Sequence, residues 1–527
     1  MKNKIIIFIS ILTSLLILIL GLNYSDRFNN FIFSNFVNTY DPLISKVPKT
    51  IDTQLNITAP KIQKSDKTLD AESLNLTPQI KINSLQNNDY WKDPRGLFPI
   101  FAYNIPDSTK NYSKSLKIIE NGGINIIING NFGWMPDPIK MKNEFKKLEN
   151  SQLKWIAIIE NECKDDFIYR NSNDEINSNI RPFLEMFNDN FVYGWYIWDE
   201  PGGNRKLCSL FNLEPNNDNE DISRMVTQIR SDSVFNHKLD FVNLFPTYWD
   251  GTPDSVSYSK YIDAFISSQK YKPKVLCIDN YPLLKSEIEG FRKDYYLNLD
   301  IICKKSIEYN IPFWIVILSS GHLDYKNPSF YEISLQVYSA LAYGAKGIGY
   351  YLYSKSWQEV GYKSWILENF VDNDNIADSL HGALYVPVKQ LNKQIQTLGK
   401  TLLNLESREI IHSSDFPNNQ MKISNSFIVN GKKKSFIKSI VNANDINLDP
   451  KVLVGILKKR IISDENDFYL LVVNKDVTMT VNVRIIFQKS PNIFKYNKND
   501  GTRLFIAKND TLNTCILPGS GELFYVE

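Results

Sequence analysis

Cysteine and histidine are scarce in this chain, which has 5 Cys and 4 His among 527 residues. The cysteines are odd in number, widely scattered and free of any Cys-x-x-Cys pair. This argues against a zinc site and against a dense disulfide framework, although one disulfide stays open. Cys277 and Cys303 lie in apolar runs and are predicted to be buried thiols. The histidines show no paired ligand spacing, so we expect no metal and no other cofactor. They are His237, His322, His381 and His412.

A strong charge of either sign is also lacking. The net charge is +2 and charged residues make up 22% of the chain, so nothing indicates a nucleic-acid-binding tail or an acidic partner. No glycine-rich phosphate loop follows the first β-prone run, which argues against a dinucleotide-binding open sheet. Apolar and aromatic residues are abundant, at 43% and 13% of the chain, and they suffice for a large core.

A long apolar run stands at the N-terminus. Lys2 and Lys4 precede the stretch Ile5–Leu22. This pattern predicts export, with residues 1–24 as a signal peptide or as an uncleaved membrane anchor. The stretch is at the lower edge of the length that spans a bilayer, and a buried core helix is the alternative. Residues 25–90 are rich in Asn, Ser, Lys, Thr and Pro, which predicts a linker.

From residue 91 onward, short β-prone apolar runs alternate with stretches of helical periodicity. Near-continuous apolar runs are typical of buried parallel strands, and eight βα units in roughly 300 residues match a closed (β/α)8 barrel. We expect this barrel to span residues 91–405 and to be closed by a helix over Leu380–Leu405; an open, doubly wound sheet is the alternative. The eight runs are Leu97–Tyr103, Ile124–Asn129, Leu153–Ile159, Val192–Trp198, Leu239–Phe245, Lys274–Ile278, Phe313–Leu318 and Gly347–Leu352.

The pattern changes after the barrel. Short β-prone segments separated by turn residues predict a small all-β sandwich over residues 406–527. These segments are Ser424–Val429, Val452–Lys458, Phe468–Asn474, Val481–Gln488, Asn492–Lys495 and Glu522–Val526.

In such a barrel, function lies where the strands end and the βα loops begin. These positions combine carboxylates, amides and large aromatics, the mixture that cleavage of a glycosidic bond requires. Any single polar residue at a strand end could simply cap a helix, but Trp198, Trp249 and Trp357 have no capping role. We therefore expect a carbohydrate substrate. The predicted substrate-binding residues are Asn129, Trp134, Trp198, Asp199, Tyr248, Trp249, Tyr281, Tyr353 and Trp357.

The strongest local signal is the segment Trp198-Asp199-Glu200-Pro201. Two adjacent acids at the end of an apolar strand are costly to bury without a task. Strand alternation is expected to turn only one of them into the barrel mouth, before Pro201 directs the chain out of the strand.

This segment resembles the end of strand four in the retaining (β/α)8 glycoside hydrolases of clan A, where an acid/base Glu usually follows Asn. Asp199 stands in the position of that Asn. The passage Leu341–Tyr353 is similar to their approach to strand eight, and Leu470–Lys475 and Pro518–Phe524 are similar to their C-terminal β domain. The resemblance covers residues 91–527. It implies that Glu200 is the general acid, with a pKa raised by the aromatic rim and by Asp279.

The chain departs from the clan at strand seven, where these enzymes carry their nucleophilic Glu. Here the strand ends in Ser319-Ser320-Gly321-His322. Asp279 is then the second predicted catalytic carboxylate, with Glu160 and Glu162 as outside candidates. A separation of roughly 6–10 Å between the Glu200 and Asp279 carboxyls would support inverting hydrolysis. A non-catalytic carbohydrate-binding protein is the main alternative, and a metal-dependent hydrolase is a weaker one.

Overall fold

The residues that the computed structural model describes belong to one compact unit. The described residues are 90–103, 112–129, 138–148, 151–158, 181, 184–202, 218–247, 255–286, 291–292, 294–354, 366–367, 382–413, 425–426, 436–445, 448, 450–460 and 467–527. The predicted export segment and almost all of the predicted linker lie outside them. None of the helices within these ranges is long and apolar enough to cross a membrane.

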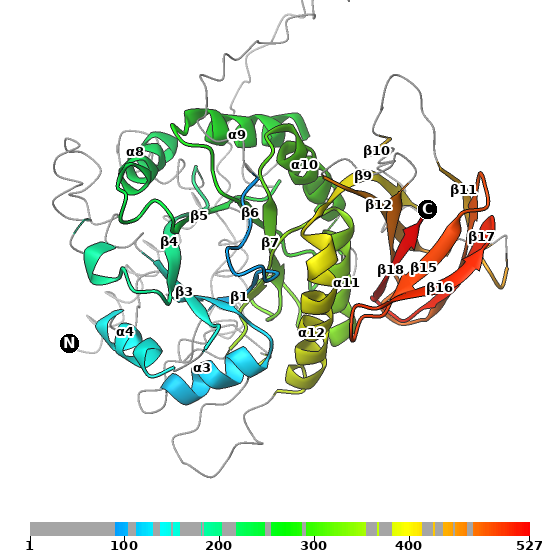
Figure 1. Ribbon diagram of the computed structural model, residues 1–527, viewed down its shortest axis with the longest axis horizontal. Helices are drawn as coiled ribbons and strands as arrows, with labels where there is room; N and C mark the ends of the chain where they lie inside the picture. The colour runs from blue at the N-terminus through cyan, green and yellow to red at the C-terminus, as the bar shows by residue number, and fades with distance from the viewer. Residues whose placement is uncertain are drawn as a thin grey trace, which may run out of the picture. The chain divides into compact units, whose positions relative to one another are not determined.

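Eight parallel strands close into a barrel in sequential order, which confirms the predicted (β/α)8 fold (Figure 1). β1 pairs with β2 on one side and with β8 on the other, so the sheet has no free edge. The strands are β1 (Ile100–Tyr103), β2 (Ile126–Asn129), β3 (Lys154–Ile158), β4 (Val192–Asp199), β5 (Leu239–Leu244), β6 (Leu276–Asp279), β7 (Phe313–Leu318) and β8 (Ile348–Tyr351).

Aromatic side chains fill the barrel interior. Trp314 on β7 lies with its ring centroid 5.4 Å from that of Phe101 and 6.0 Å from that of Phe241. Gly349 on β8 leaves the room for this layer, because an added Cβ would lie 2.1 Å from the Phe101 ring. Trp91 contacts Trp314 as well, at 5.8 Å. The barrel is therefore a packed core, and its chemistry is confined to the strand ends.

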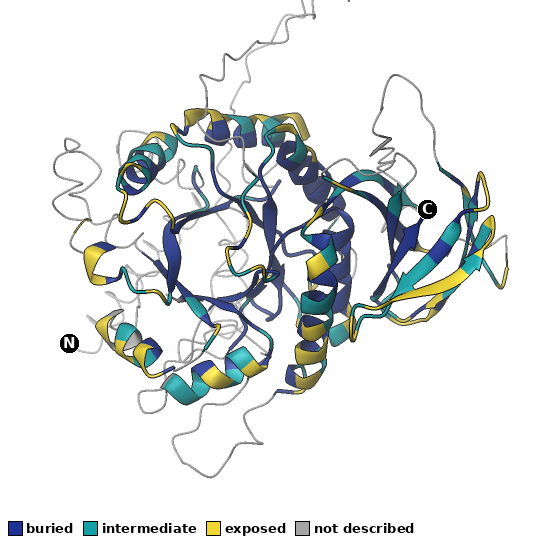
Figure 2. Cartoon of the chain, in the orientation of Figure 1, coloured by how far each residue is buried: buried dark blue, intermediate teal, exposed yellow. Residues whose placement is uncertain are grey.

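Helices surround the strands and present their apolar faces to them (Figure 2). Ser329 begins α11 with a capping box, in which its hydroxyl accepts the Glu332 N–H while the Glu332 carboxylate accepts the Ser329 N–H. The described helices are α3 (Tyr112–Asn121), α4 (Pro138–Lys146), α8 (Asp218–Ser231), α9 (Ser255–Ser268), α10 (Tyr295–Glu308), α11 (Phe330–Ala342) and α12 (Tyr385–Leu402).

The C-terminal residues form two antiparallel sheets, which confirms the predicted β sandwich. One sheet has the order β10-β9-β12-β13-β18-β15-β16 and the other the order β11-β14-β17. The strands that the sequence predicted are β10 (Asn425–Ser426), β12 (Val452–Lys459), β13 (Phe468–Asn474), β14 (Val481–Phe487), β15 (Asn492–Tyr496) and β18 (Gly521–Val526). The strands that it missed are β9 (Leu405–His412), β11 (Ile437–Asn442), β16 (Arg503–Lys508) and β17 (Thr511–Ile516). These four alternate polar with apolar residues or are largely exposed, so their apolar signal is weak.

The larger sheet packs against the barrel through α11. Gly455 on β12 allows this approach, because a Cβ there would lie 2.4 Å from the Ala342 carbonyl oxygen. On the far side, α11 faces the barrel strand β7. The helix is consequently buried along nearly its whole length (Figure 2). The α11 sequence carries so few charges because neither of its long faces is open to water.

Candidate active site

The end of β4 brings Tyr196 and Asp199 to the same side of the strand. Residues three apart normally face opposite sides. In β4, however, the register with β5 shifts between Tyr196 and Trp198, so that Ile197 is an extra residue relative to β5. The Tyr196 hydroxyl consequently donates a 2.5 Å hydrogen bond to Asp199 Oδ1.

Glu200 follows with a left-handed backbone, at φ 48°. A residue with a side chain adopts this conformation rarely, at a cost of roughly 1–3 kcal/mol. Its N–H donates to the Asn243 carbonyl at 2.8 Å. The expectation that only one of the two acids enters the mouth is therefore wrong. The bulge turns Asp199 inward, and the left-handed turn ends the strand alternation before Glu200.

Asn243 on β5 joins the carboxylates. Its Nδ2 donates to Asp199 Oδ1 at 3.1 Å and to Asp279 Oδ1 at 3.0 Å. The Glu200 side chain also interacts with Asp279. These four residues are the acidic cluster. Carboxyl groups this close to one another disfavour each other's ionised form, so the cluster favours retention of a proton.

Asp279 is the carboxyl whose titration the site changes. It is 5% exposed, and burial raises its pKa to about 7. The charge of Asp199 raises this pKa as well, while the hydrogen bonds from Asn243 and Glu200 oppose the shift. The raised pKa that the sequence led us to expect on Glu200 stays a prediction. The carboxyl whose raised pKa the structure supports is Asp279, the more buried of the two.

Aromatic residues adjoin the acidic cluster. The Tyr281 ring stacks on Tyr351 at 5.5 Å, and both contact the His322 ring edge-on, at 5.7 and 5.4 Å. Tyr103 contacts Tyr351 at 5.7 Å. Burial raises the pKa of Tyr281, and the charge of the nearby Asp279 raises it further.

His322 is a neutral base in this environment. Burial lowers its pKa below the ordinary range of histidine. Its Nδ1 lies 2.9 Å from the Ser320 carbonyl oxygen, which can only accept, so Nδ1 carries the proton and Nε2 is the basic nitrogen.

The structure brings together four of the predicted site residues, namely Asp199, Glu200, Asp279 and Tyr281. Tyr353 was predicted to bind the substrate, but its side chain is fully buried against Tyr350. Its hydroxyl occupies the space beside Gly122, after α3. Trp198 is only 7% exposed, so packing covers most of its ring. The backbone of Asn129 ends β2, and its side chain is not described. Outside the described residues lie Trp134, Glu160, Glu162, Tyr248, Trp249 and Trp357.

Sequence reasoning gave no site role to four members of the site, namely Asn243, Tyr196, Tyr351 and His322. Asn243 had a usable signal, since it is the one amide in the otherwise apolar end of the run Leu239–Leu244. The two tyrosines had none, because a buried tyrosine in a strand resembles ordinary core. As to metals, no group of three or more His, Cys, Asp or Glu in the described ranges is arranged to hold an ion.

No protein-family model and no curated protein matches this chain. Several solved glycosidase structures are similar to it. A catalytic mutant of Gan42B, a GH42 β-galactosidase from G. stearothermophilus, is 9% identical, with 83% of this chain and 99% of that chain covered and a TM-score of 0.43. The maltogenic α-amylase AmyB from Thermotoga neapolitana is 12% identical, with 82% and 99% covered and a TM-score of 0.40.

The β-galactosidase from the psychrophilic Marinomonas ef1 is 11% identical, with 58% of this chain covered and a TM-score of 0.40. This chain spans 60% of the length of that protein. At such identities and TM-scores the similarity assigns no function, and function depends on the site.

Proposed function

We propose that this protein is a glycoside hydrolase that uses Glu200 as its proton donor. The observation that carries the proposal is the cluster at the strand ends, where Asn243 Nδ2 donates to both Asp199 and Asp279 and the Glu200 N–H donates to the Asn243 carbonyl. Burial raises the pKa of Asp279 in this cluster to about 7. Glycosidic cleavage needs an acid that protonates the leaving oxygen, and a carboxyl pair that keeps a proton near neutral pH supplies one. The left-handed backbone of Glu200 supports this role, because strained residues concentrate at functional sites.

Asp199 and the tyrosines have separate tasks in this proposal. The hydroxyl of Tyr196 and the amide of Asn243 both donate to Asp199, which favours its ionised form. The carboxylate then stabilises the positive charge that develops at the anomeric carbon. The stacked pair Tyr281 and Tyr351 offers an apolar edge for a sugar ring.

In this proposal Asp279 positions the Glu200 carboxyl and is not the second catalytic carboxylate on the opposite side of the substrate. Paired carboxyls lie about 5–5.5 Å apart in retaining glycosidases and about 6.5–9.5 Å apart in inverting ones. Glu200 and Asp279 interact directly through their side chains, which does not suit a pair placed on opposite faces of a sugar ring. We therefore assign the activation of water to His322 Nε2, at the end of β7, and regard Asp279 as a positioning residue for the Glu200 proton.

The second candidate function is carbohydrate binding without catalysis. It is favoured by Ser319 and Ser320, which stand where the resembling enzymes have a carboxylate nucleophile. Both serines are fully buried, and Ser319 Oγ donates to the Leu352 carbonyl at 3.0 Å.

Replacing Glu200 by Gln separates the two functions. For a hydrolase, we expect the release of reducing ends from a polysaccharide panel to fall about 10²–10⁴-fold, because the acid is lost while its shape is kept. Aryl glycosides with good leaving groups should be affected less. Glu220→Gln, on the exposed first turn of α8, is the matched control. Near-normal turnover in the Glu200 variant would remove it from the mechanism; binding without turnover in the unchanged protein would establish the second function.

We also propose that the protein is exported and held or released by its N-terminal segment, as Lys2, Lys4 and Ile5–Leu22 indicate. Cell fractionation checks this: full-length protein found free in the cytoplasm would contradict it.

A further inference from the structure

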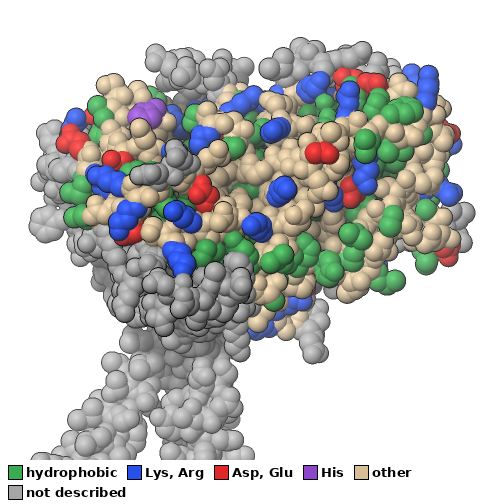
Figure 3. Space-filling model, turned by 60° about the horizontal axis from the view of Figure 1, so that its bottom comes forward, with side chains coloured by type: hydrophobic (Ala, Val, Ile, Leu, Met, Phe, Trp, Pro, Cys, Tyr) green, Lys and Arg blue, Asp and Glu red, His purple; other side chains and the backbone are tan. Residues whose placement is uncertain are grey.

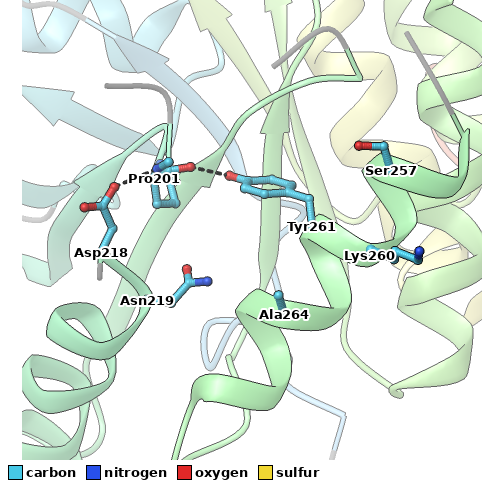
Figure 4. A pocket seen from close by; sticks show the side chains of 8 residues that line it. Pro201, Asp218, Asn219, Ser257, Lys260, Tyr261 and Ala264 are labelled. Atoms are coloured by element: carbon cyan, nitrogen blue, oxygen red, sulfur yellow. Dashed lines mark hydrogen bonds between the residues drawn. The ribbon is translucent and has the colours of Figure 1, made fainter. Parts of the chain in front are cut away.

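A cavity of about 240 Å³ lies beside Pro201, the residue after Glu200 in the chain (Figure 4). Its walls come from three elements, which are the residues after β4, the first residues of α8, and α9. It lies outside the barrel strands, and no residue of the acidic cluster lines it. Pro201 and Gly202, which directly follow Glu200, form one wall.

Hydrogen bonds attach this wall to both helices. The Tyr261 hydroxyl donates to the Pro201 carbonyl at 2.9 Å and accepts the Phe245 N–H at 3.2 Å. Asp218 accepts the Gly202 N–H at 2.6 Å. The polar end of Tyr261 is thereby occupied, as Figure 4 shows, and what the residue offers the cavity is its ring.

Two polar side chains on the lining are uncommitted. Within the described part of the chain, the Asn219 amide group makes no hydrogen bond, since only its backbone carbonyl is used, and Lys260 makes no ion pair. An amide and an ammonium group suit hydroxyl oxygens, and an aromatic ring suits the apolar face of a sugar.

The charges around the cavity favour a neutral ligand. The lining carries one ammonium group, on Lys260, and one carboxylate, on Asp218, and the first turn of α8 adds Glu220 and Asp221. An anionic ligand would meet these carboxylates. Figure 3 shows one face of the molecule, on which Lys and Arg side chains lie interspersed with Asp and Glu side chains.

We propose that this cavity is a second sugar-binding site that takes one neutral hexose or pentose unit. The identification of the ligand as a sugar rests on the proposed function. Pockets for drug-sized ligands begin at about 300 Å³, so a cavity of this size suits a single ring. The ligand is either an outlying unit of the substrate or a free monosaccharide of the same chemistry. Its binding would hold Pro201 and Gly202, and through them the backbone of Glu200.

The test uses the full chain and three probes, D-glucose, D-galactose and D-xylose, with D-glucuronate as the anionic comparison. Saturation-transfer NMR measures binding, and soaked crystals locate it. Ala264 lines the cavity on α9 and is exposed, so Ala264→Leu fills the space without burying new bulk elsewhere. Ser267→Leu, exposed on the same helix but off the lining, is the matched control, and Asn219→Ala removes the amide without adding volume.

We expect at least one neutral sugar in the cavity, a loss of that binding of at least tenfold in both lining variants, and no loss in the Ser267 control. An empty cavity in every soak, preferential binding of D-glucuronate, or unchanged binding in Ala264→Leu would overturn the proposal.

Kinetics distinguishes the two sources of the ligand. If the sugar is an outlying substrate unit, Ala264→Leu raises KM for long oligosaccharides and leaves KM for an aryl monoglycoside unchanged. If it is a free monosaccharide, added sugar changes turnover in the unchanged protein and not in the variant. Cavity binding without any turnover supports this site and contradicts only the hydrolase, whereas turnover with an empty cavity does the reverse.

Discussion

Asp279 is the residue through which the site makes the stability of the folded protein depend on pH. Burial and the neighbouring charge of Asp199 raise its pKa to about 7, from an ordinary value of 3.8. The folded protein therefore binds more protons than the unfolded chain between these values. Stability contributed by the protonated form is complete below pH 3.8 and is lost as the pH rises toward 7.

Asp279→Asn is expected to change the pH dependence of catalysis, because it removes one of the two carboxyls that interact in the site. In the unchanged protein, kcat/KM should fall as the pH rises through about 7, because the Glu200–Asp279 pair loses its proton there. Without Asp279, a carboxyl that shares no proton ionises nearer to pH 4, so the alkaline limb should move down by at least one pH unit. The variant should also unfold at higher temperature at pH 8 but not at pH 4. Asp300→Asn, a buried aspartate on α10, is the control; a limb that stays at pH 7 would exclude the pair.

At the scale of elements, the interior of the barrel depends on small residues opposite large ones. Gly349→Ala on β8 should lower the free energy of unfolding by about 1–3 kcal/mol, since the new methyl group would lie 2.1 Å from the Phe101 ring. Phe101→Leu should reduce that cost, so denaturation of both single variants and the double variant should give a non-additive cycle. Fully additive losses would mean that this contact does not limit the packing.

The strands of the barrel were predictable from the sequence, but their irregularities were not. The eight barrel strands were predictable, because each is an apolar run whose burial on both faces follows from its composition. The bulge at Ile197 was not, since an extra residue in one strand is visible only against its partner. That bulge brings Tyr196 to Asp199, so the sequence predicted the acids and not their hydrogen bonds.

At the scale of the whole molecule, the barrel and the β domain meet around His412, which ends β9. Its Nε2 lies 3.0 Å from the Tyr343 hydroxyl, its ring packs on Tyr296 at 4.8 Å, and its Nδ1 lies 3.5 Å from Lys475 Nζ. Burial lowers the pKa of His412 to about 3, and the Lys475 charge adds to this. The junction therefore accommodates only the neutral ring.

This junction should make the protein sensitive to acid. The unfolded chain binds the His412 proton below pH 6.5, while the folded chain resists it down to about pH 3, so stability is complete above 6.5 and declines below it. The loss from this residue is at most about 2 kcal/mol at pH 5. His412→Gln, which keeps a partner for the Tyr343 hydroxyl, should flatten the decline in chemical denaturation between pH 6.5 and 5. An unchanged slope would show that other groups dominate.

The sequence by itself determined the barrel, the β sandwich and the position of Glu200 at the end of a strand. These follow from local properties, namely apolar runs, their spacing and a polar segment after each run. The tertiary structure alone decided which side chains meet. Asn243 joins Asp199 to Asp279 because three strands from different parts of the chain end side by side. It also decided that Asp279 takes a raised pKa, since desolvation and neighbouring charges depend on distances that no linear pattern contains.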